Sequence, residues 1–359
     1  MEERNQQIQM LDLMQRPAFL AEGGIITHVN AAAARYLLQV GTTLASLVTT
    51  GAEELADFTQ GMLHLTLQLD SFDFEATILR EGNRDIVLLE NTGDASPLRA
   101  LSLAALELRM PMANASAITD RMLPLATENA EPKVQEYAAQ LHRRMMQMQR
   151  IINNMSDCAL FGEDSQQNME CVEITALLQE QLEGAAHALA QAGITLAYTL
   201  PENRIYTMAY PQKLERAVYN LLSNAAKFSP AGSTIRVQLR HNGNRLALSV
   251  TDQGPGTESA GDIFTRYLRQ PGLEDPRMGL GLGMVIIRAA AKLHGGAVLV
   301  DHPAGAGTRF TLTMAIRQQK TNEVRCHPLR IDYAGEQDHC LLELSDVLPA
   351  SLYAVENNP

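Results

Sequence analysis

The first ninety residues alternate apolar and polar side chains in several short runs. Residues 62–69 (MLHLTLQL) and 72–79 (FDFEATIL) place an apolar residue at nearly every second position, which is typical of half-buried strands. The flanking segments contain short strands separated by a glycine turn, and helices whose apolar residues recur at helical spacing. We therefore expect strands at 17–27 (a pair), 62–69, 72–79 and 84–90, and helices at 1–16 and 29–40.

Beyond residue 97 the apolar spacing changes to alternating steps of three and four. This heptad pattern indicates helices in a bundle or coiled coil. The first seam runs through Leu98, Leu101, Ala105, Leu108, Met112, Ala115, Thr119 and Met122. The second runs through Val134, Tyr137, Leu141, Met145, Met148, Ile152, Met155 and Ala159. The polar connection at 127–132 predicts an antiparallel hairpin.

Two helices alone cannot bury both seams well, so a homodimer that forms a four-helix bundle is the simplest expectation. A hairpin that packs on another domain of the same chain is the alternative. From about residue 170 amphipathic helices alternate with strands and hairpins up to residue 317. After a polar linker, 329–333 (LRIDY) and 340–344 (CLLEL) alternate again, and we expect them to add an antiparallel pair.

Composition narrows the class of protein. The chain has 359 residues, a formal net charge of −12 and four cysteines, none of them in a CxxC pair. The acidic balance argues against a general nucleic-acid binder or a polybasic membrane-surface protein, and the cysteine spacing argues against a zinc site. Apolar runs far shorter than about 20 residues and the absence of a leader-like N-terminus predict a cytoplasmic protein without a membrane span.

Three segments in the second half carry candidate chemistry. Asn220, Asn224 and Lys227 fall on one face of a predicted helix, where amide oxygens suit Mg²⁺ and the lysine suits phosphate. Asp252 ends a predicted strand in Asp-Gln-Gly-Pro-Gly and can accept a hydrogen bond from the exocyclic amine of a base. A glycine-rich stretch at 279–283 precedes a helix, where backbone amides favour anions. Each signal alone is weak: a solvated helix face or a simple turn explains it.

In this order and spacing, the three segments resemble the N box and the two glycine boxes of the ATP-binding domain shared by histidine kinases, DNA gyrase, Hsp90 and MutL. Residues 262–267 stand where histidine kinases carry a Phe box, and 305–310 (GAGTRF) resembles the closing G-x-G-T-x-F of that domain. The resemblance implies a GHKL α/β sandwich and the cofactors ATP and Mg²⁺. It covers about residues 170–317.

The resemblance also implies roles for individual residues. Asn224 would ligate Mg²⁺ with help from Asn220, and Lys227 would contact phosphate. Asp252 would bind the adenine amine, and Thr308 would support the adenine site. Phe228, where the family often has tyrosine, would keep the aromatic wall. The glycine-box residues that would shape the base pocket and the lid over the triphosphate are Gly254, Gly256, Gly279, Gly281, Leu282 and Gly283.

The helical hairpin resembles the dimerisation and phosphotransfer domain of histidine kinases, whose first helix carries an acceptor His followed by Glu-Leu-Arg-Thr-Pro. Here the segment reads Leu106-Glu-Leu-Arg-Met110-Pro, so the Glu, Leu, Arg and Pro of the motif are kept, with Glu107 as the retained H-box acid. The acceptor position and the position that usually carries threonine are both apolar, as Leu106 and Met110. Leucine has no nucleophilic atom, and we expect no phosphoryl transfer at position 106. His142, one residue after the second seam, is a conceivable substitute acceptor, but a solvated helix-face histidine is the simpler interpretation.

Residues 14–91 resemble a PAS sensor domain, with the strand–turn–strand and alanine-rich helix of 19–48 as the match. The expected architecture is thus an α+β multidomain chain: a PAS-like domain at 1–95, a dimerising hairpin at 96–165, an ATP-binding domain at 166–317 and a C-terminal extension of unknown role at 318–359. A PAS ligand is expected but not identified, and no haem or flavin ligand is indicated.

The resemblances together predict a histidine-kinase-like signalling protein that binds ATP·Mg²⁺, does not autophosphorylate at position 106, and acts on a partner such as a response regulator or another kinase. It would then be a pseudokinase. One alternative is an active histidine kinase with a displaced acceptor. Another is a GHKL ATPase or an anti-sigma-type serine kinase, and a last one is a scaffold that binds no nucleotide.

Overall fold

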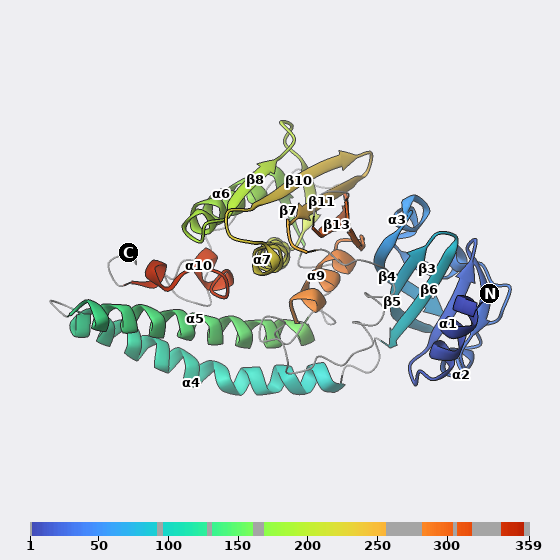
Figure 1. The fold of residues 1–359 in the computed structure, drawn as a ribbon, viewed down its shortest axis with the longest axis horizontal. Coiled ribbons are helices and arrows are strands. Elements are labelled where there is room, and N and C mark those ends of the chain that lie inside the picture. The colour runs from blue at the N-terminus through green and yellow to red at the C-terminus, as the bar shows by residue number, and fades with distance from the viewer. Residues whose placement is uncertain are drawn as a thin grey trace.

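The computed structural model of the chain describes residues 2–91, 96–127, 131–160, 169–255, 282–303, 307–317 and 339–354. Figure 1 shows an N-terminal unit and a central unit, each built on a sheet, and two long helices that lie along one side of the molecule. A short C-terminal helix lies between the long helices and the central unit.

The N-terminal unit is an antiparallel sheet in the order β2-β1-β6-β5-β4, with β3 paired to β4. Its strands are β1 (Ala18–Glu22), β2 (Ile25–Val29), β3 (Val48–Thr50), β4 (Gly61–Leu69), β5 (Phe72–Glu81) and β6 (Arg84–Asn91). Its helical segments are α1 (Glu2–Asp12), α2 (Ala31–Ala34), η1 (Leu44–Leu47) and α3 (Ala52–Asp57). All the strands predicted in this region are confirmed.

The helix expected over 29–40 is wrong in its length. Asn30 caps α2 by accepting a hydrogen bond from the amide of Ala33, but the helix ends at Ala34. Leu37 then adopts a left-handed backbone with φ of 58°. That conformation cannot continue a right-handed helix, and the alanine-rich composition did not reveal it.

The two long helices are α4 (Ser96–Thr127) and α5 (Pro132–Leu160), and they pack against each other as the predicted hairpin. Ala105, Met112, Met145 and Ile152 form their shared core. Outside this shared core, the following seam residues are exposed: Leu108, Met122, Val134, Tyr137, Leu141 and Met148. The hairpin therefore buries only part of each seam. Among the described residues, no helix is both long and apolar enough to cross a membrane.

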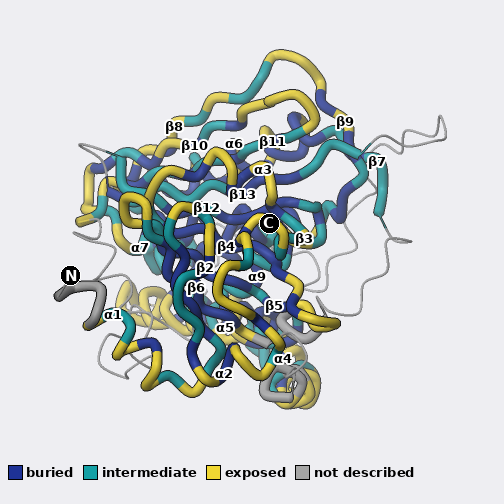
Figure 2. The backbone as a smooth tube through the Cα atoms, turned by 90° about the vertical axis from the view of Figure 1, so that its right-hand side faces the viewer, coloured by how far each residue is buried: buried dark blue, intermediate teal, exposed yellow. Residues whose placement is uncertain are grey.

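The central unit is a sheet in the order β12-β13-β11-β10-β8 with helices packed on it, plus a separate β7-β9 pair. Its strands are β7 (Glu170–Glu173), β8 (Thr195–Thr199), β9 (Tyr206–Ala209), β10 (Thr234–Asn242), β11 (Arg245–Thr251), β12 (Val298–Asp301) and β13 (Arg309–Ala315). Its helices are α6 (Ile174–Gln191), α7 (Pro211–Phe228) and α9 (Leu282–Leu293). Figure 2 shows that the buried positions concentrate where these layers meet.

The two sheets are joined, which the sequence did not predict. Strand β12 pairs antiparallel with β4 through Val298↔His64, Leu299↔Leu63 and Val300↔Met62, so one sheet of eleven strands runs through both units. Helix α3 strengthens the joint, because the carboxylate of the buried Glu54 accepts a hydrogen bond from Thr313 and pairs with Arg245, each at 2.6 Å. Edge strands that would otherwise be exposed are thereby covered.

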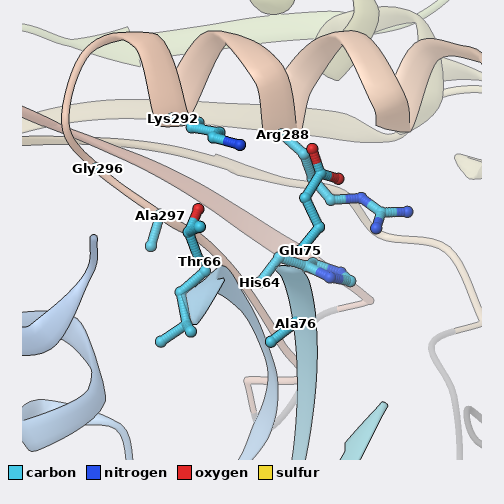
Figure 3. Close-up of a pocket in the computed structure, with 9 residues that line it drawn as sticks. His64, Thr66, Glu75, Ala76, Arg288, Lys292, Gly296 and Ala297 are labelled. Atoms are coloured by element: carbon cyan, nitrogen blue, oxygen red, sulfur yellow. The ribbon is translucent and has the colours of Figure 1, made fainter. Parts of the chain in front are cut away.

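A small pocket of about 20 Å³ lies at this joint, between β4, β5 and α9 (Figure 3). Its lining includes the buried His64, whose Nδ1 lies 2.9 Å from the Thr77 hydroxyl, and Arg288 and Lys292 of α9. Burial, and then the charge of Arg288, lower the pKa of His64 well below its ordinary value. The volume holds about one water molecule and is too small for a sensor ligand.

The C-terminal segment corrects a second expectation. Residues 340–344 lie in and beside a short helix, α10 (His339–Glu343), followed by the helical turn η3 (Ala350–Tyr353). Leu341 is buried together with Cys340, Leu342 and Leu344, so this run has no exposed face of the kind an edge strand needs. The segment packs between α5, α6 and α7. As a helix, it can place side chains against all three of these neighbours. The other half of the expected pair, 329–333, lies outside the described residues.

Candidate functional site

Helix α7 presents the polar residues of the candidate site. Pro211 at its first turn fits the start of a helix, and Leu214, Val218 and Leu221 bury its apolar face in the core. Asn220 is 2% exposed. Asn224 and Lys227 follow one and two turns later and are partly exposed, so the helix displays all three along one face.

The end of β11 and the start of β13 bring Asp252 and Thr308 together, as predicted. One carboxylate oxygen of Asp252 accepts hydrogen bonds from the amides of Gly254, at 2.8 Å, and Thr308, at 3.0 Å. The backbones also pair, because the Asp252 amide donates to Thr308 O and the Gly307 amide donates to Asp252 O. Asp252 is 3% exposed, and the backbone amides of Gly254 and Thr308 orient its carboxylate. This leaves the other carboxylate oxygen as an acceptor at a defined position.

Three glycines let the surrounding backbone approach this site. A Cβ on Gly254 would lie 2.8 Å from Phe228 O, and one on Gly283 would lie 2.7 Å from Asn220 Oδ1. A Cβ on Gly307 would collide with the Asp252 carboxylate. The glycines therefore hold α7, the end of β11 and the start of α9 closer together than side chains would allow. Leu282, the residue before Gly283, is buried against Ile286 of the same helix.

Several predicted residues cannot be compared with the fold. Gly256, Gly279 and Gly281, and the Phe-box-like segment 262–267, lie outside the described residues. Phe228 is 42% exposed at the C-terminal end of α7, beside Gly254.

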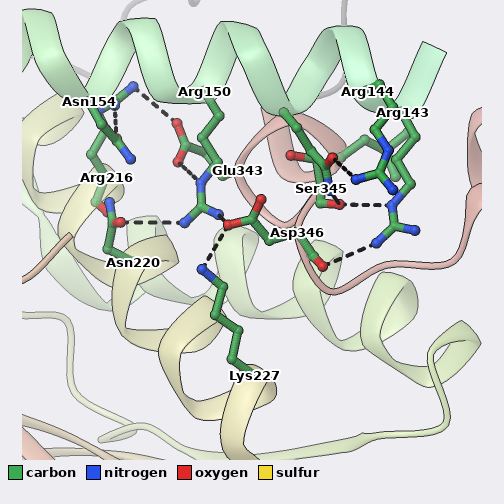
Figure 4. Close-up of polar contacts among 12 residues, drawn as sticks. Arg143, Arg144, Arg150, Asn154, Arg216, Asn220, Lys227, Glu343, Ser345 and Asp346 are labelled. Carbon is green, nitrogen blue, oxygen red and sulfur yellow. Dashed lines mark hydrogen bonds and ion pairs between the residues drawn. The ribbon is translucent and has the colours of Figure 1, made fainter. Parts of the chain in front are cut away.

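Along α7 the site also meets ionic groups that no motif predicted (Figure 4). Lys227 pairs with Asp346 of the C-terminal segment at 2.8 Å. Arg150 of α5 pairs with the same carboxylate at 2.6 Å and reaches Asn220 Oδ1 at 3.4 Å. Burial works to raise the pKa of Asp346, but the charges of Arg150 and Lys227 outweigh it and lower the pKa.

Behind this contact lies a buried ionic cluster. Glu343 is fully buried and lies 3.5 Å from Arg150 Nε and 3.0 Å from Arg216 Nη1. Arg216 also pairs with Asp157 of α5 at 2.5 Å. Burial, opposed by the charge of Arg216, raises the pKa of Asp157. The cluster links α5, α7 and the C-terminal segment, and none of the four residues named here belongs to a seam or motif singled out from the sequence.

The H-box-like segment lies on the exposed side of α4. Leu106 is 51% exposed and Met110 is 67% exposed, and neither is among the residues that form the shared core of the hairpin. Arg109 donates to the Ser156 hydroxyl at 3.4 Å and so contacts the second helix. Glu107 is exposed.

His142 is not the solvated histidine that its position on α5 suggests. It is 5% exposed, and its Nδ1 lies 3.1 Å from the carbonyl oxygen of Tyr353, under the C-terminal segment. The burial arises from a segment more than two hundred residues away, which no local pattern indicates.

Comparison with known proteins adds independent information. Residues 209–318 match the family described as "Histidine kinase-, DNA gyrase B-, and HSP90-like ATPase". The chain is 27% identical over 228 residues to histidine protein kinase DivJ of Caulobacter vibrioides, a match that covers 62% of this chain and 38% of that protein. It is 32% identical over 200 residues to sensor protein QseC of Escherichia coli K12, covering 55% of this chain and 43% of QseC.

The chain thus spans only about two fifths of these two relatives. Among solved structures, full-length ShkA in complex with AMPPNP aligns over 65% of this chain and 47% of its own, with 22% identity and a TM-score of 0.47, which is too low to inform the arrangement of the parts. The matched segment contains α7, Asp252 and Thr308, the same residues that the fold brings together. Residues 209–318 thus match the histidine kinase-, DNA gyrase B- and HSP90-like ATPase family, and over a longer stretch the chain is similar to histidine kinases.

Proposed function

We propose that the protein is a signalling member of this family that binds ATP·Mg²⁺ and does not phosphorylate itself at the usual position. The observation that carries the proposal is the Asp252–Gly254–Thr308 contact, which holds one carboxylate oxygen on two backbone amides at 2.8 and 3.0 Å. A carboxylate held in this way recognises the exocyclic amine of adenine and repels the carbonyl oxygen that guanine carries at that position.

Asn220 and Asn224 supply the hard amide oxygens that Mg²⁺ prefers, and Lys227 supplies a cation for phosphate. Bound Mg²⁺ would neutralise charge on the phosphates of the nucleotide. The amino end of α9, which begins at Leu282, adds backbone amides that favour an anion. A net charge of −12 makes such local groups necessary for binding a polyanion.

We further propose that the chain acts as a homodimer. The exposed part of the two seams includes Leu108, Met122, Tyr137 and Leu141, each at least 49% exposed in the single chain. A second hairpin would cover these side chains in a four-helix bundle. ATP, or a ligand of the PAS-like unit, would then shift the dimer between arrangements that a response regulator or partner kinase distinguishes.

Leu106 favours a pseudokinase over an active histidine kinase, because a hydrocarbon side chain cannot accept a phosphoryl group. The displaced-acceptor alternative would need His142, which is buried under the C-terminal segment. The anti-sigma-type alternative does not explain the long hairpin with its exposed seams.

Calorimetric titration of the full chain tests the proposal. We expect ATP with Mg²⁺ to bind, GTP with Mg²⁺ to bind much more weakly, and ATP with excess EDTA to lose most of its affinity. The absence of a binding signal with ATP·Mg²⁺ would overturn the proposal, and equal affinities for ATP and GTP would contradict the role given to Asp252.

A further inference from the structure

The C-terminal segment 339–354 is built into the protein from two sides. Its apolar residues join the core of the ATPase domain, where Leu344 and Leu348 are fully buried and Tyr353 is 1% exposed. The Tyr353 hydroxyl donates to Leu341 O at 2.8 Å and so closes the segment on itself. The segment thus has a defined conformation next to the nucleotide site.

Helix α5 of the hairpin holds the opposite side of the same segment. Arg143 donates to Ser345 O at 3.0 Å and to Asp346 O at 3.1 Å, and Gln147 donates to Ser345 O at 2.9 Å. Figure 4 shows Arg143 reaching from α5 to Ser345 and Asp346 in the turn that follows α10. The contacts fix the backbone of Asp346, and its carboxylate points away from Arg143 toward α7.

That carboxylate engages the groups that the proposed function assigns to the polyphosphate end of ATP. It lies 2.8 Å from Lys227 Nζ, and Arg150, which also binds it, reaches Asn220 Oδ1. A phosphate group on Lys227 would bring a second anion beside Asp346, and a Mg²⁺ ion on Asn220 would bring a cation beside Arg150. Both approaches are repulsive at such separations.

Resting on the proposed function, we propose that residues 339–354 are an intramolecular competitor of the nucleotide: the Asp346 carboxylate neutralises Lys227 until ATP·Mg²⁺ displaces it. Because linkage is reciprocal, ATP also weakens the hold of α5 on the segment. Nucleotide binding would then release the ATPase domain from the hairpin.

The affinity of the full chain for ATP·Mg²⁺ tests the proposal by calorimetry. We expect Asp346→Asn to bind about tenfold more tightly than wild type, within the usual range for coupled sites. The matched control is Glu173→Gln, which removes one negative charge from the same domain at the Arg204 ion pair and should leave the affinity unchanged. Equal affinities of Asp346→Asn and wild type would overturn the proposal.

A second variant separates release of the segment from a simple change of charge. Arg143→Gln removes a positive charge near the site, so electrostatics alone would weaken ATP binding. Loss of the Arg143 contacts to Ser345 and Asp346 should instead loosen the segment and strengthen ATP binding several-fold. Weaker or unchanged binding by this variant would contradict the proposal.

Hydrogen exchange provides the direct readout of displacement. We expect saturating ATP·Mg²⁺ to increase amide exchange within 339–354 in the wild-type chain, and unchanged or slower exchange there would overturn the proposal. If no variant binds ATP at all, the proposed function fails and the competitor role with it. Binding that is equal in wild type and Asp346→Asn removes the competitor role alone.

Discussion

The two ends of the candidate nucleotide site are built in different ways. At the base end, backbone amides fix the Asp252 carboxylate, and glycines at 254 and 307 allow the close approach. At the phosphate end, side chains from α5 and the C-terminal segment engage Lys227 and Asn220. The first end is preorganised by the fold itself, whereas the second is completed by groups that can be withdrawn.

This difference teaches where regulation can act. Main-chain hydrogen bonds between β11 and β13 cannot be exchanged without unfolding the sheet, so recognition of the base is constant. Ion pairs between side chains of separate elements can be exchanged for ligand contacts while the sheet stays folded. The phosphate end is therefore the part of the site that can report the state of the hairpin.

The largest effect is expected from the buried cluster behind the phosphate end. Arg150→Met leaves the fully buried Glu343 with Arg216 but without its second cation, and should lower the free energy of unfolding by about 3 kcal/mol, because a buried charge that is only partly compensated is costly. Urea unfolding of the variant and of wild type measures this difference in the free energy of unfolding. Adding Glu343→Gln should restore part of the loss, and a double variant that is no more stable than Arg150→Met would show that the pair is not coupled.

The next effect concerns the base end. Asp252→Asn keeps an oxygen for the two amides but presents an NH₂ group to the adenine amine, so two donors face each other. We expect ATP affinity to fall by roughly 30-fold to 100-fold, corresponding to about 2–3 kcal/mol. Calorimetric titration checks this, with circular dichroism as the control for folding. Wild-type affinity in this variant would place the base elsewhere.

The smallest effect concerns the joint between the two sheets, which lies away from the site. The folded-state pKa of His64 is lowered, so below about pH 6.5 the unfolded chain binds a proton at this side chain that the folded chain does not. This histidine therefore contributes stability that is complete above that pH and declines as the pH falls. Between pH 6.5 and 5.5 the loss should be about 1 kcal/mol.

His64→Gln should lose less stability than wild type over the same pH range, although its stability at pH 7.5 can differ from that of wild type. Urea unfolding at the two pH values gives the comparison. Identical pH dependence in both proteins would mean that His64 is not a neutral, buried residue of the joint.

The sequence predicted local features well and distant contacts poorly. Period-two and heptad patterns located the strands of the N-terminal sheet and the hairpin, and the resemblance to the ATP-binding domain placed Asp252 and Thr308 in one site. Three of the features that were missed are the β4–β12 pairing, the helix at 339–343 and the burial of His142. Each depends on a neighbour far away in the chain, and neither propensity nor periodicity contains that neighbour.

The central claim is that the protein binds ATP·Mg²⁺ but carries leucine, at position 106 of α4, where histidine kinases carry the acceptor histidine. The most direct test incubates the full chain with γ-³²P-labelled ATP and Mg²⁺ and measures acid-labile, base-stable phosphate on the protein, beside Leu106→His. The account predicts no such label on the wild-type chain and labelled protein with the histidine in place. Acid-labile, base-stable label on the wild-type chain would contradict it.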